Sequence, residues 1–384
     1  MIEKIRQSHL DSFGSAPLML KVPSRINLIG EHTDYNLGYS LPAAVGQSMI
    51  FGFSHNDNGF MNIEACNIGE RIQFSIWEHD YPEGSWTGYF KTIITELKER
   101  DFEVDGINCT FGGDIPIGAG MSSSSALNCG FLYGLNELFG WKLTNRDIMF
   151  IAQAAEHRYG VKGGLMDQYT ILNGRKDHAL LLDFKTLTHT LVPMFTGDYH
   201  FVLFNTCVKH SLVHSPYNQR RHSCDRVLKL LHEDNVYIQS YQDFDEHTLD
   251  LYRNQIKKDD FIKAQFVLRE NDRVLKAAET LKSGDLKTFG QLLWQSHEGL
   301  RNDYEVSCEE LDFLVDHIRE KGGVLGSRMM GGGFGGCTIN LIHKDHIKEI
   351  WNDLDQAYHQ QFGIRAEMFE VEVGEGIRLL DAGC

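Results

Sequence analysis

Residues 22–42 read VPSRINLIGEHTDYNLGYSLP, in which the apolar pair Leu28–Ile29 gives way to the polar run EHTDYN at 31–36. Proline and glycine punctuate the stretch, which indicates a strand followed by an ordered loop. Glu31 and Asp34 can accept hydrogen bonds, and His32 can donate or accept them. This inventory suits a ligand that presents several hydroxyls at fixed angles, such as a sugar. The alternative is a polar surface loop with a chance cluster.

A second stretch, GDIPIGAGMSSSSALN at 113–128, leads into a run that is apolar nearly all round. Gly118 and Gly120 allow backbone N–H groups to approach a ligand closely. A helix that begins near Ser122 would offer free N–H groups and a favourable dipole to an anion, and serine hydroxyls can also bind Mg²⁺. The alternative is that the serines only cap the helix. The chain contains no G-x-x-x-x-G-K-[ST] motif of the Walker type.

A third stretch, SRMMGGGFGGC at 327–337, satisfies the spacing G-x-G-x-x-G. The strand-like run CTINLIH follows at the position where a dinucleotide-binding fingerprint requires a helix. We therefore reject a Rossmann assignment and expect a tight turn whose backbone passes close to a ligand or to another loop.

Two carboxylates in residues 152–174, AQAAEHRYGVKGGLMDQYTILNG, are candidates for a functional role. Glu156 lies near the end of an apolar helical pattern, where a lone glutamate is usually a solvated charge. Asp167 follows two glycines and has apolar neighbours on both sides. We expect Asp167 to be buried, and a buried carboxylate must be paired or functional.

The composition limits the possible partners and compartments. The chain has 384 residues and a formal net charge of −16, from 37 basic and 53 acidic side chains. Such a surface repels nucleic acid and anionic lipid, so we expect neither as a partner. The chain carries no C-x-x-C pair, no signal-peptide pattern and no membrane-spanning apolar run. We expect a cytoplasmic protein with reduced cysteines, and a monomer.

The hydrophobic patterns predict strands and helices that interleave without a regular βαβ order. This favours an α+β chain, and its length favours two domains, 1–195 and 196–384, divided near the turn-rich MFTGDYH at 194–200. The predicted strands are 18–22, 72–76, 107–111, 179–183, 201–206, 338–343 and 366–373. The predicted helices are 86–97, 122–139, 145–159, 216–233, 257–282, 286–300, 309–321 and 345–362.

Taken in order, these segments resemble the GHMP family of small-molecule kinases and, within it, the galactokinases. The matching runs are RINLIGEHTDYN at 25–36, PIGAGMSSS at 116–124, MDQ at 166–168, SPYNQRR at 215–221 and GGGFGG at 331–336. One glycine loop would be weak evidence, but five ordered matches over essentially the whole chain are specific.

The resemblance implies a fold and a reaction. The fold is an N-terminal domain like the second domain of ribosomal protein S5, joined to a ferredoxin-like α+β domain, with the active site between them. The reaction is that of a sugar 1-kinase in galactose metabolism, the Leloir pathway. ATP phosphorylates the anomeric hydroxyl of α-D-galactose, which gives galactose 1-phosphate and ADP.

The resemblance also implies residue roles. Asp167 would accept the proton of the anomeric hydroxyl, and Arg25 would keep Asp167 ionised and stabilise the developing alkoxide. Ser124 and Glu156 would hold Mg²⁺. The sugar would contact Glu31, His32, Asp34, Gly164, Asp167 and Tyr217. ATP would contact Trp86, Gly118, Gly120, Ser122, Ser123, Ser124 and Lys209. Trp86 also lies on the apolar face of its helix, so a packing role fits it equally well.

The chain departs from the usual family pattern at Ser24, Pro216, Phe266 and Met330. None of these positions carries the implied chemistry, so an altered sugar preference stays open. Two alternatives to a galactokinase also stay open. One is a regulatory sensor that binds galactose and ATP without turnover. The other is a kinase for a related sugar, such as N-acetylgalactosamine or L-arabinose.

Overall fold

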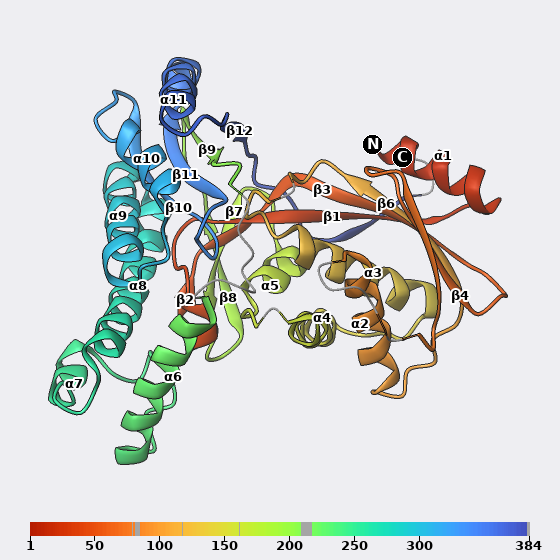
Figure 1. Ribbon diagram of the computed structural model, residues 1–384, viewed down its shortest axis with the longest axis horizontal. Coiled ribbons are helices and arrows are strands. Elements are labelled where there is room, and N and C mark those ends of the chain that lie inside the picture. The colour runs from red at the N-terminus through yellow and green to blue at the C-terminus, as the bar shows by residue number, and fades with distance from the viewer. Residues whose placement is uncertain (79, 81–84, 117, 161, 209–216, 382–384) are drawn as a thin grey trace.

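The structure is a computed structural model that describes residues 1–381 except 79, 81–84, 117, 161 and 209–216. Its strands form three sheets, and its helices cover them as shown in Figure 1. The described part of the chain contains no helix that is long and apolar enough to cross a membrane.

The largest sheet has six strands in the order β13-β1-β3-β6-β4-β5. All neighbouring strands are antiparallel except β4 and β6, which are parallel. Residues of opposite parity on one strand face opposite sides of a sheet. Accordingly, Met19 packs against α1 (Ile2–Phe13), whereas Val22 faces α3 (Ser123–Phe139) on the other side. The strands are β1 (Leu18–Asn27), β3 (Pro42–His55), β4 (Phe60–Ala65), β5 (Glu70–Ser75), β6 (Ile107–Gly113) and β13 (Arg378–Leu380).

Four helices cover the inner face of this sheet and lie below it in Figure 1. Gly130 on α3 lies so close to Phe51 and Val22 that a Cβ there would clash with both. Helix α3 therefore packs directly on the strands and its first residues are fixed at the end of the sheet. The other helices are α2 (Thr87–Lys98), α4 (Asn145–Tyr159) and α5 (Met166–Asn173).

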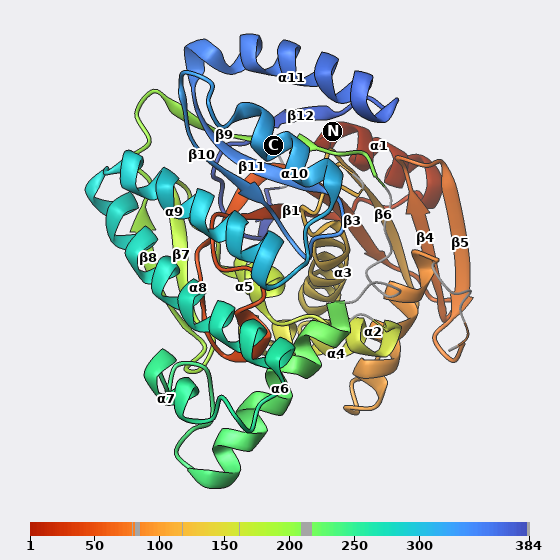
Figure 2. The same ribbon diagram turned by 60° about the vertical axis from the view of Figure 1, so that its left-hand side comes forward.

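The second sheet has four strands in the order β10-β11-β9-β12, all antiparallel. Phe201 and Leu203 face the main core with α9, whereas Val202 and Phe204 face α10 and α11, which lie on the outer side in Figure 2. The elements are β9 (Tyr199–Asn205), β10 (Val324–Met329), β11 (Cys337–His343), β12 (Glu367–Glu370), α9 (Leu286–Glu298), α10 (Glu309–Ile318) and α11 (Ile347–Phe362).

A three-stranded sheet and three further helices complete the fold. The sheet has the strand order β2-β7-β8 and consists of β2 (Tyr39–Ser40), β7 (His178–Asp183) and β8 (Thr188–Pro193). Helix α8 (Lys258–Ser283) crosses this sheet and packs on α6 (Tyr217–Asp234) and α7 (Glu246–Leu251). Strand β13 returns the end of the chain to β1 in the first sheet. The domain limits at 195/196 stay a prediction.

The secondary structure confirms most elements that the patterns predicted. Helix α4 opens with the expected capping box between Thr144 and Asp147. The predicted strand at 366–373 is shorter, because β12 ends at Glu370. The patterns did not predict α1, α5, α7, β2, β3, β4, β8, β10 or β13. The sequence of β3, PAAVGQSMIFGFSH, is buried on both faces over much of its length and therefore lacks a clear alternation.

Candidate active site

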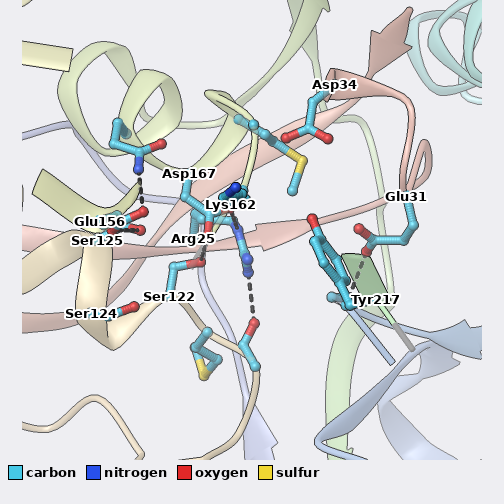
Figure 3. Close-up of a pocket in the computed structure, with 18 of the residues that line it drawn as sticks. Arg25, Glu31, Asp34, Ser122, Ser124, Ser125, Glu156, Lys162, Asp167 and Tyr217 are labelled. Atoms are coloured by element: carbon cyan, nitrogen blue, oxygen red, sulfur yellow. Dashed lines mark hydrogen bonds and ion pairs between the residues drawn. The ribbon is translucent and has the colours of Figure 1, made fainter. Parts of the chain in front are cut away.

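One cavity of about 240 Å³ gathers most of the predicted site residues (Figure 3). Its walls come from the loop after β1, the start of α3, the end of α4, the start of α5, the start of α6 and the glycine loop after β10. Elements from both halves of the chain therefore build it. The predicted residues that line it are Arg25, Glu31, His32, Asp34, Gly118, Gly120, Ser122, Ser123, Ser124, Glu156, Gly164, Asp167 and Tyr217.

Asp167 lies at the centre of a charged cluster in the first turn of α5. The Arg25 guanidinium donates from Nε to Asp167 Oδ1 at 2.6 Å and from Nη1 to the Gly120 carbonyl at 2.7 Å. Ser122 Oγ donates to Asp167 Oδ2 at 2.5 Å. Burial alone would lower the pKa of Arg25, but the charge of Asp167 outweighs this effect and raises it. Arg25 thus ties the carboxylate to the loop before α3.

The side chain of Asp167 is 28% exposed, so the expectation that it is buried was wrong. Asp167 faces the cavity from the first turn of α5, and Met166 beside it also lines the cavity. In contrast, Ile171 and Leu172 further along the helix are buried in the core. The expectation that Asp167 is paired is confirmed by its contact with Arg25.

Asp34 lies across the cavity from the centre of this cluster (Figure 3). A Cβ on Gly164 would come within 1.9 Å of Asp34 Oδ2, so only glycine leaves room for this carboxylate. Burial, and then the charge of Asp167, raise the pKa of Asp34 to about 6. The two carboxylates thus act on each other within one site.

Glu31 is almost fully buried and bonds two groups of the glycine-rich segment. Its Oε1 accepts a hydrogen bond from the Gly331 amide at 2.7 Å and forms an ion pair with Arg328 Nη2 at 3.1 Å. Arg328, which is fully buried, also donates to the carbonyls of Asn27 and Leu28. The expectation that the third loop passes close to another loop is confirmed by these contacts.

His32 has positive φ and lies within a group of tyrosines. Its Nδ1 is 2.8 Å from the Tyr35 hydroxyl, and its ring centroid is 5.3 Å from that of Tyr217. Burial lowers the pKa of His32 to about 3, with further lowering by nearby Arg220 and Arg328. The imidazole is therefore neutral at physiological pH.

The loop before α3 leaves its backbone open toward the cavity. Gly118, Gly120 and Ser122 have φ of 79°, 68° and 58°, a left-handed region that glycine adopts readily. Ser122 makes no side-chain cap on α3, since its hydroxyl bonds Asp167 instead. The first N–H groups of α3 therefore stay available for an anion, and the capping alternative does not describe Ser122.

Glu156 is buried beside the start of α3 and is bonded only to neutral donors. Its oxygens accept from Ser125 Oγ at 2.8 Å, Asn128 Nδ2 at 3.1 Å and Gln168 Nε2 at 2.7 Å. No Lys, Arg or His of the described chain forms an ion pair with it. Burial raises the pKa of Glu156 to about 7. A buried carboxylate without a cationic partner, close to Ser124 on the cavity wall, fits a divalent cation.

The described residues contain no cluster of three His, Cys, Asp or Glu side chains that could hold a metal ion. A cation at Glu156 would therefore need further oxygen ligands from a phosphate group and from water. This is the coordination mode in which Mg²⁺ is usually bound with a nucleotide.

One predicted ATP contact, Trp86, is placed away from the cavity. Its ring packs against Phe90 and Phe111, and its Nε1 donates to Glu70. These contacts support the packing role that the sequence left open. Lys209 lies outside the described residues, and so does Pro216.

Sequence reasoning missed Lys162, whose side chain reaches the cavity from the loop before α5 (Figure 3). The only local signal was a basic residue between Gly160 and Gly163. It also missed Gln168, which donates to Glu156, although the MDQ run had been singled out.

The comparisons with known proteins agree with this geometry. The family model for the N-terminal domain of GHMP kinases matches residues 88–175, and that for their C-terminal domain matches residues 277–360. A mevalonate kinase from Methanococcus jannaschii, 15% identical, has the same fold with a TM-score of 0.67 over 94% of this chain and 99% of its own. The fold and the site define a GHMP kinase.

A galactokinase galactose-binding signature matches residues 7–55. The chain is 40% identical to a galactokinase from Thermotoga maritima over 362 residues, which cover 94% of this chain and 99% of the relative. The crystal structure of Lactococcus lactis galactokinase complexed with galactose is 32% identical, with a TM-score of 0.93 over 98% of this chain and 99% of that one. The chain belongs to the galactokinase family of GHMP kinases.

Proposed function

We propose that this protein transfers the terminal phosphoryl group of ATP to the anomeric hydroxyl of α-D-galactose. The observation that carries the proposal is the Arg25–Asp167–Ser122 cluster. Through β1 it joins the sugar loop (residues 28–38) to α5 and to the phosphate loop (residues 114–122) in one cavity. Phosphoryl transfer requires mainly that the reactants are positioned and that charge is stabilised. A rigid bridge between the two loops supplies the positioning.

In the transfer step the anomeric oxygen forms a bond to the terminal phosphorus while the bond to the β,γ-bridging oxygen breaks. The hydroxyl proton passes to the Asp167 carboxylate, whose partly exposed side chain faces the cavity. Arg25 is paired with that carboxylate and lies close enough to stabilise charge that develops on the oxygen. Because Arg25 also bonds the Gly120 carbonyl, it fixes the acceptor side relative to the phosphate side.

The phosphate groups of ATP would bind at Gly118, Gly120 and Ser122–Ser124 through the open backbone and the free N–H groups of α3. Mg²⁺ would be held by Ser124 and Glu156 and, when bound, would neutralise phosphate charge. Such neutralisation matters in this cavity because the acidic residues Glu31, Asp34 and Asp167 also line it.

The hydroxyls of the sugar would bond to Asp34, His32, the Gly164 backbone and the Tyr217 phenol, with Glu31 fixed behind them. A site that pairs each hydroxyl rejects an epimer, because the wrong stereochemistry leaves buried polar groups without partners. The cytoplasmic location and the monomeric state stay predictions.

The test is ADP release from Mg-ATP with a panel of galactose, N-acetylgalactosamine, L-arabinose and glucose, combined with calorimetric binding of each sugar. We expect turnover with galactose at the highest kcat/KM. Galactose binding without turnover would support the sensor, and preferred turnover of another sugar would assign the protein to that substrate.

A further inference from the structure

A buried row of hydrogen-bonding side chains runs from the sugar loop to α6. The Tyr35 hydroxyl is 2.8 Å from His32 Nδ1 and 3.0 Å from the Tyr304 hydroxyl. The Tyr304 hydroxyl is in turn 3.4 Å from the Cys224 sulfur on α6. The four side chains form a continuous chain that leads away from the cavity, which we call the tyrosine relay (His32, Tyr35, Tyr304 and Cys224).

Close packing holds the relay in place. The ring of His32 is 4.9 Å from that of Tyr304 and 5.9 Å from that of Tyr35. Phe266 packs on the far side of Tyr304 at 4.7 Å. The apolar Phe266 ring offers no hydrogen-bonding group, and the Tyr304 hydroxyl contacts Tyr35 and Cys224.

The acceptor strengths of His32 and Cys224, at the two ends of the relay, decide which hydroxyl donates in each hydrogen bond. Burial raises the pKa values of Tyr35 and Tyr304 well above the ordinary range and lowers that of His32, so both phenols stay protonated and the imidazole stays neutral. An imidazole nitrogen is a strong acceptor, whereas a thiol sulfur is a weak one. The favourable arrangement therefore has Tyr304 donating to Tyr35 and Tyr35 donating to His32 Nδ1.

A neutral imidazole that accepts at Nδ1 carries its proton on Nε2. His32 Nε2 is buried, and no described group completes a hydrogen bond with it, although the Gly332 backbone lies close enough to act on the ring. His32 lines the cavity beside Tyr217. Since the Gly332 contact is incomplete by geometry, the Nε2–H group keeps the capacity to donate to a hydroxyl bound beside it in the cavity.

We propose that Tyr35 and Tyr304 are positioning residues that hold His32 as the Nε2–H tautomer, so that it donates a hydrogen bond to a hydroxyl of the bound sugar. This inference rests on the proposed function only for the identity of the ligand. Neither tyrosine touches substrate in this arrangement; both act through His32.

The experiment is Tyr35→Phe, which removes the hydroxyl at unchanged shape. ¹⁵N-resolved NMR of the imidazoles, with His32 assigned by comparison with His32→Gln, reads the tautomer without any need for turnover. We expect the wild-type protein to show the Nε2–H pattern, and Tyr35→Phe to lose it. In the same variant the KM for galactose should rise about tenfold, the equivalent of one lost hydrogen bond, with kcat and the KM for ATP nearly unchanged.

The matched control is Tyr358→Phe, which removes a fully buried hydroxyl that donates to the Thr206 carbonyl, away from the relay. It should leave the His32 tautomer and the galactose KM unchanged. Tyr304→Phe should shift both in the same direction as Tyr35→Phe but less, since Tyr35 can still donate.

Either of two results would overturn the proposal. One is an Nδ1–H pattern in the wild-type protein, and the other is a tautomer that Tyr35→Phe leaves unchanged. If the tautomer shifts as expected while galactose is not bound by any variant, the relay stands and the proposed function fails, so the two failures are distinguishable.

Discussion

The sugar loop and the phosphate loop face each other across one cavity but are held in opposite ways. Distant residues fix the sugar loop at both ends: Arg328 bonds the Leu28 carbonyl, Glu270 accepts from the Gly30 amide, and Asn271 accepts from the Tyr39 amide. The phosphate loop is bonded at its Gly120 carbonyl by Arg25, and three of its residues, 118, 120 and 122, have positive φ.

The difference follows from what each loop has to bind. A sugar is recognised by side chains in fixed directions, so the loop that carries them is secured by buried groups before the ligand arrives. A phosphate is bound by backbone N–H groups, so the loop that offers them keeps those groups free of protein partners. The account therefore predicts that changes in the two regions have separate effects on the two substrates.

Asp167→Asn should have the largest effect, because Asp167 lies where the two regions meet. We expect kcat to fall by about 10³- to 10⁴-fold, as for the loss of a proton acceptor, while the dissociation constant for galactose stays within about tenfold. ADP release measures the first quantity and calorimetry the second. Full activity in this variant would remove Asp167 from the mechanism.

Arg328→Met tests the anchoring of the sugar loop. The change leaves Glu31 buried without its cation and the carbonyls of Asn27 and Leu28 without a donor, so the free energy of unfolding should fall by about 3–5 kcal/mol. Urea denaturation measures it. The control is Lys344→Met, which breaks an exposed ion pair with Asp198 and should leave the midpoint within experimental error. Equal midpoints for both variants would contradict the anchoring.

Asp34→Ala separates the two substrates. The variant loses the carboxylate that accepts hydrogen bonds from the sugar hydroxyls, so the KM for galactose should rise roughly 10- to 100-fold and that for ATP should change little. Steady-state kinetics with each substrate varied in turn provides the measurement. An equal rise in both KM values would contradict the division of the cavity into two sides.

Gly164→Ala sharpens the same point with a smaller change. Its Cβ would displace the Asp34 carboxylate, so we expect the galactose KM to rise about tenfold, by loss of one hydrogen bond. The neighbouring Gly163 is a matched control, since a Cβ there meets no atom within 4 Å. If Gly163→Ala raised the galactose KM as much, the steric argument for Gly164 would be wrong.

The smallest effect concerns pH and the metal side of the cavity. The pKa of Glu156 is raised from 4.5 to about 7 in the folded protein, so between these values the folded state binds more protons than the unfolded state. This stabilising contribution is present below pH 4.5 and is lost as the pH rises through 7. The difference in melting temperature between the wild type and Glu156→Gln, measured by thermal unfolding across this pH range, should show the decline. A flat difference would mean that Glu156 ionises normally.

The motifs could be read from the sequence because each is local. Each motif brings its groups together within a few positions, namely residues 31–36, 122–124 and 331–336, and could therefore be recognised alone. The family resemblance then implied that the three motifs meet in one cavity. The anchors could not be read in this way. Arg328 and Leu28 are 300 residues apart, and nothing in the neighbourhood of either predicts the contact.

The exposure of Asp167 and the packing of Trp86 both depend on helix placement. The apolar neighbours of Asp167 suggested burial, but the direction of α5 decides which side chains face the cavity. Trp86 lies at the start of an apolar helix, and its packing on Phe111 of β6 depends on how that helix crosses the sheet. Helix placement is a long-range property that local patterns do not fix.

The most direct test of the account is a crystal structure with galactose and a non-hydrolysable ATP analogue bound together. We expect the anomeric hydroxyl within hydrogen-bond distance of the Asp167 carboxylate, with the terminal phosphoryl group facing it from the first turn of α3. A sugar bound with its anomeric carbon turned away from Asp167, or a nucleotide bound outside this cavity, would contradict it.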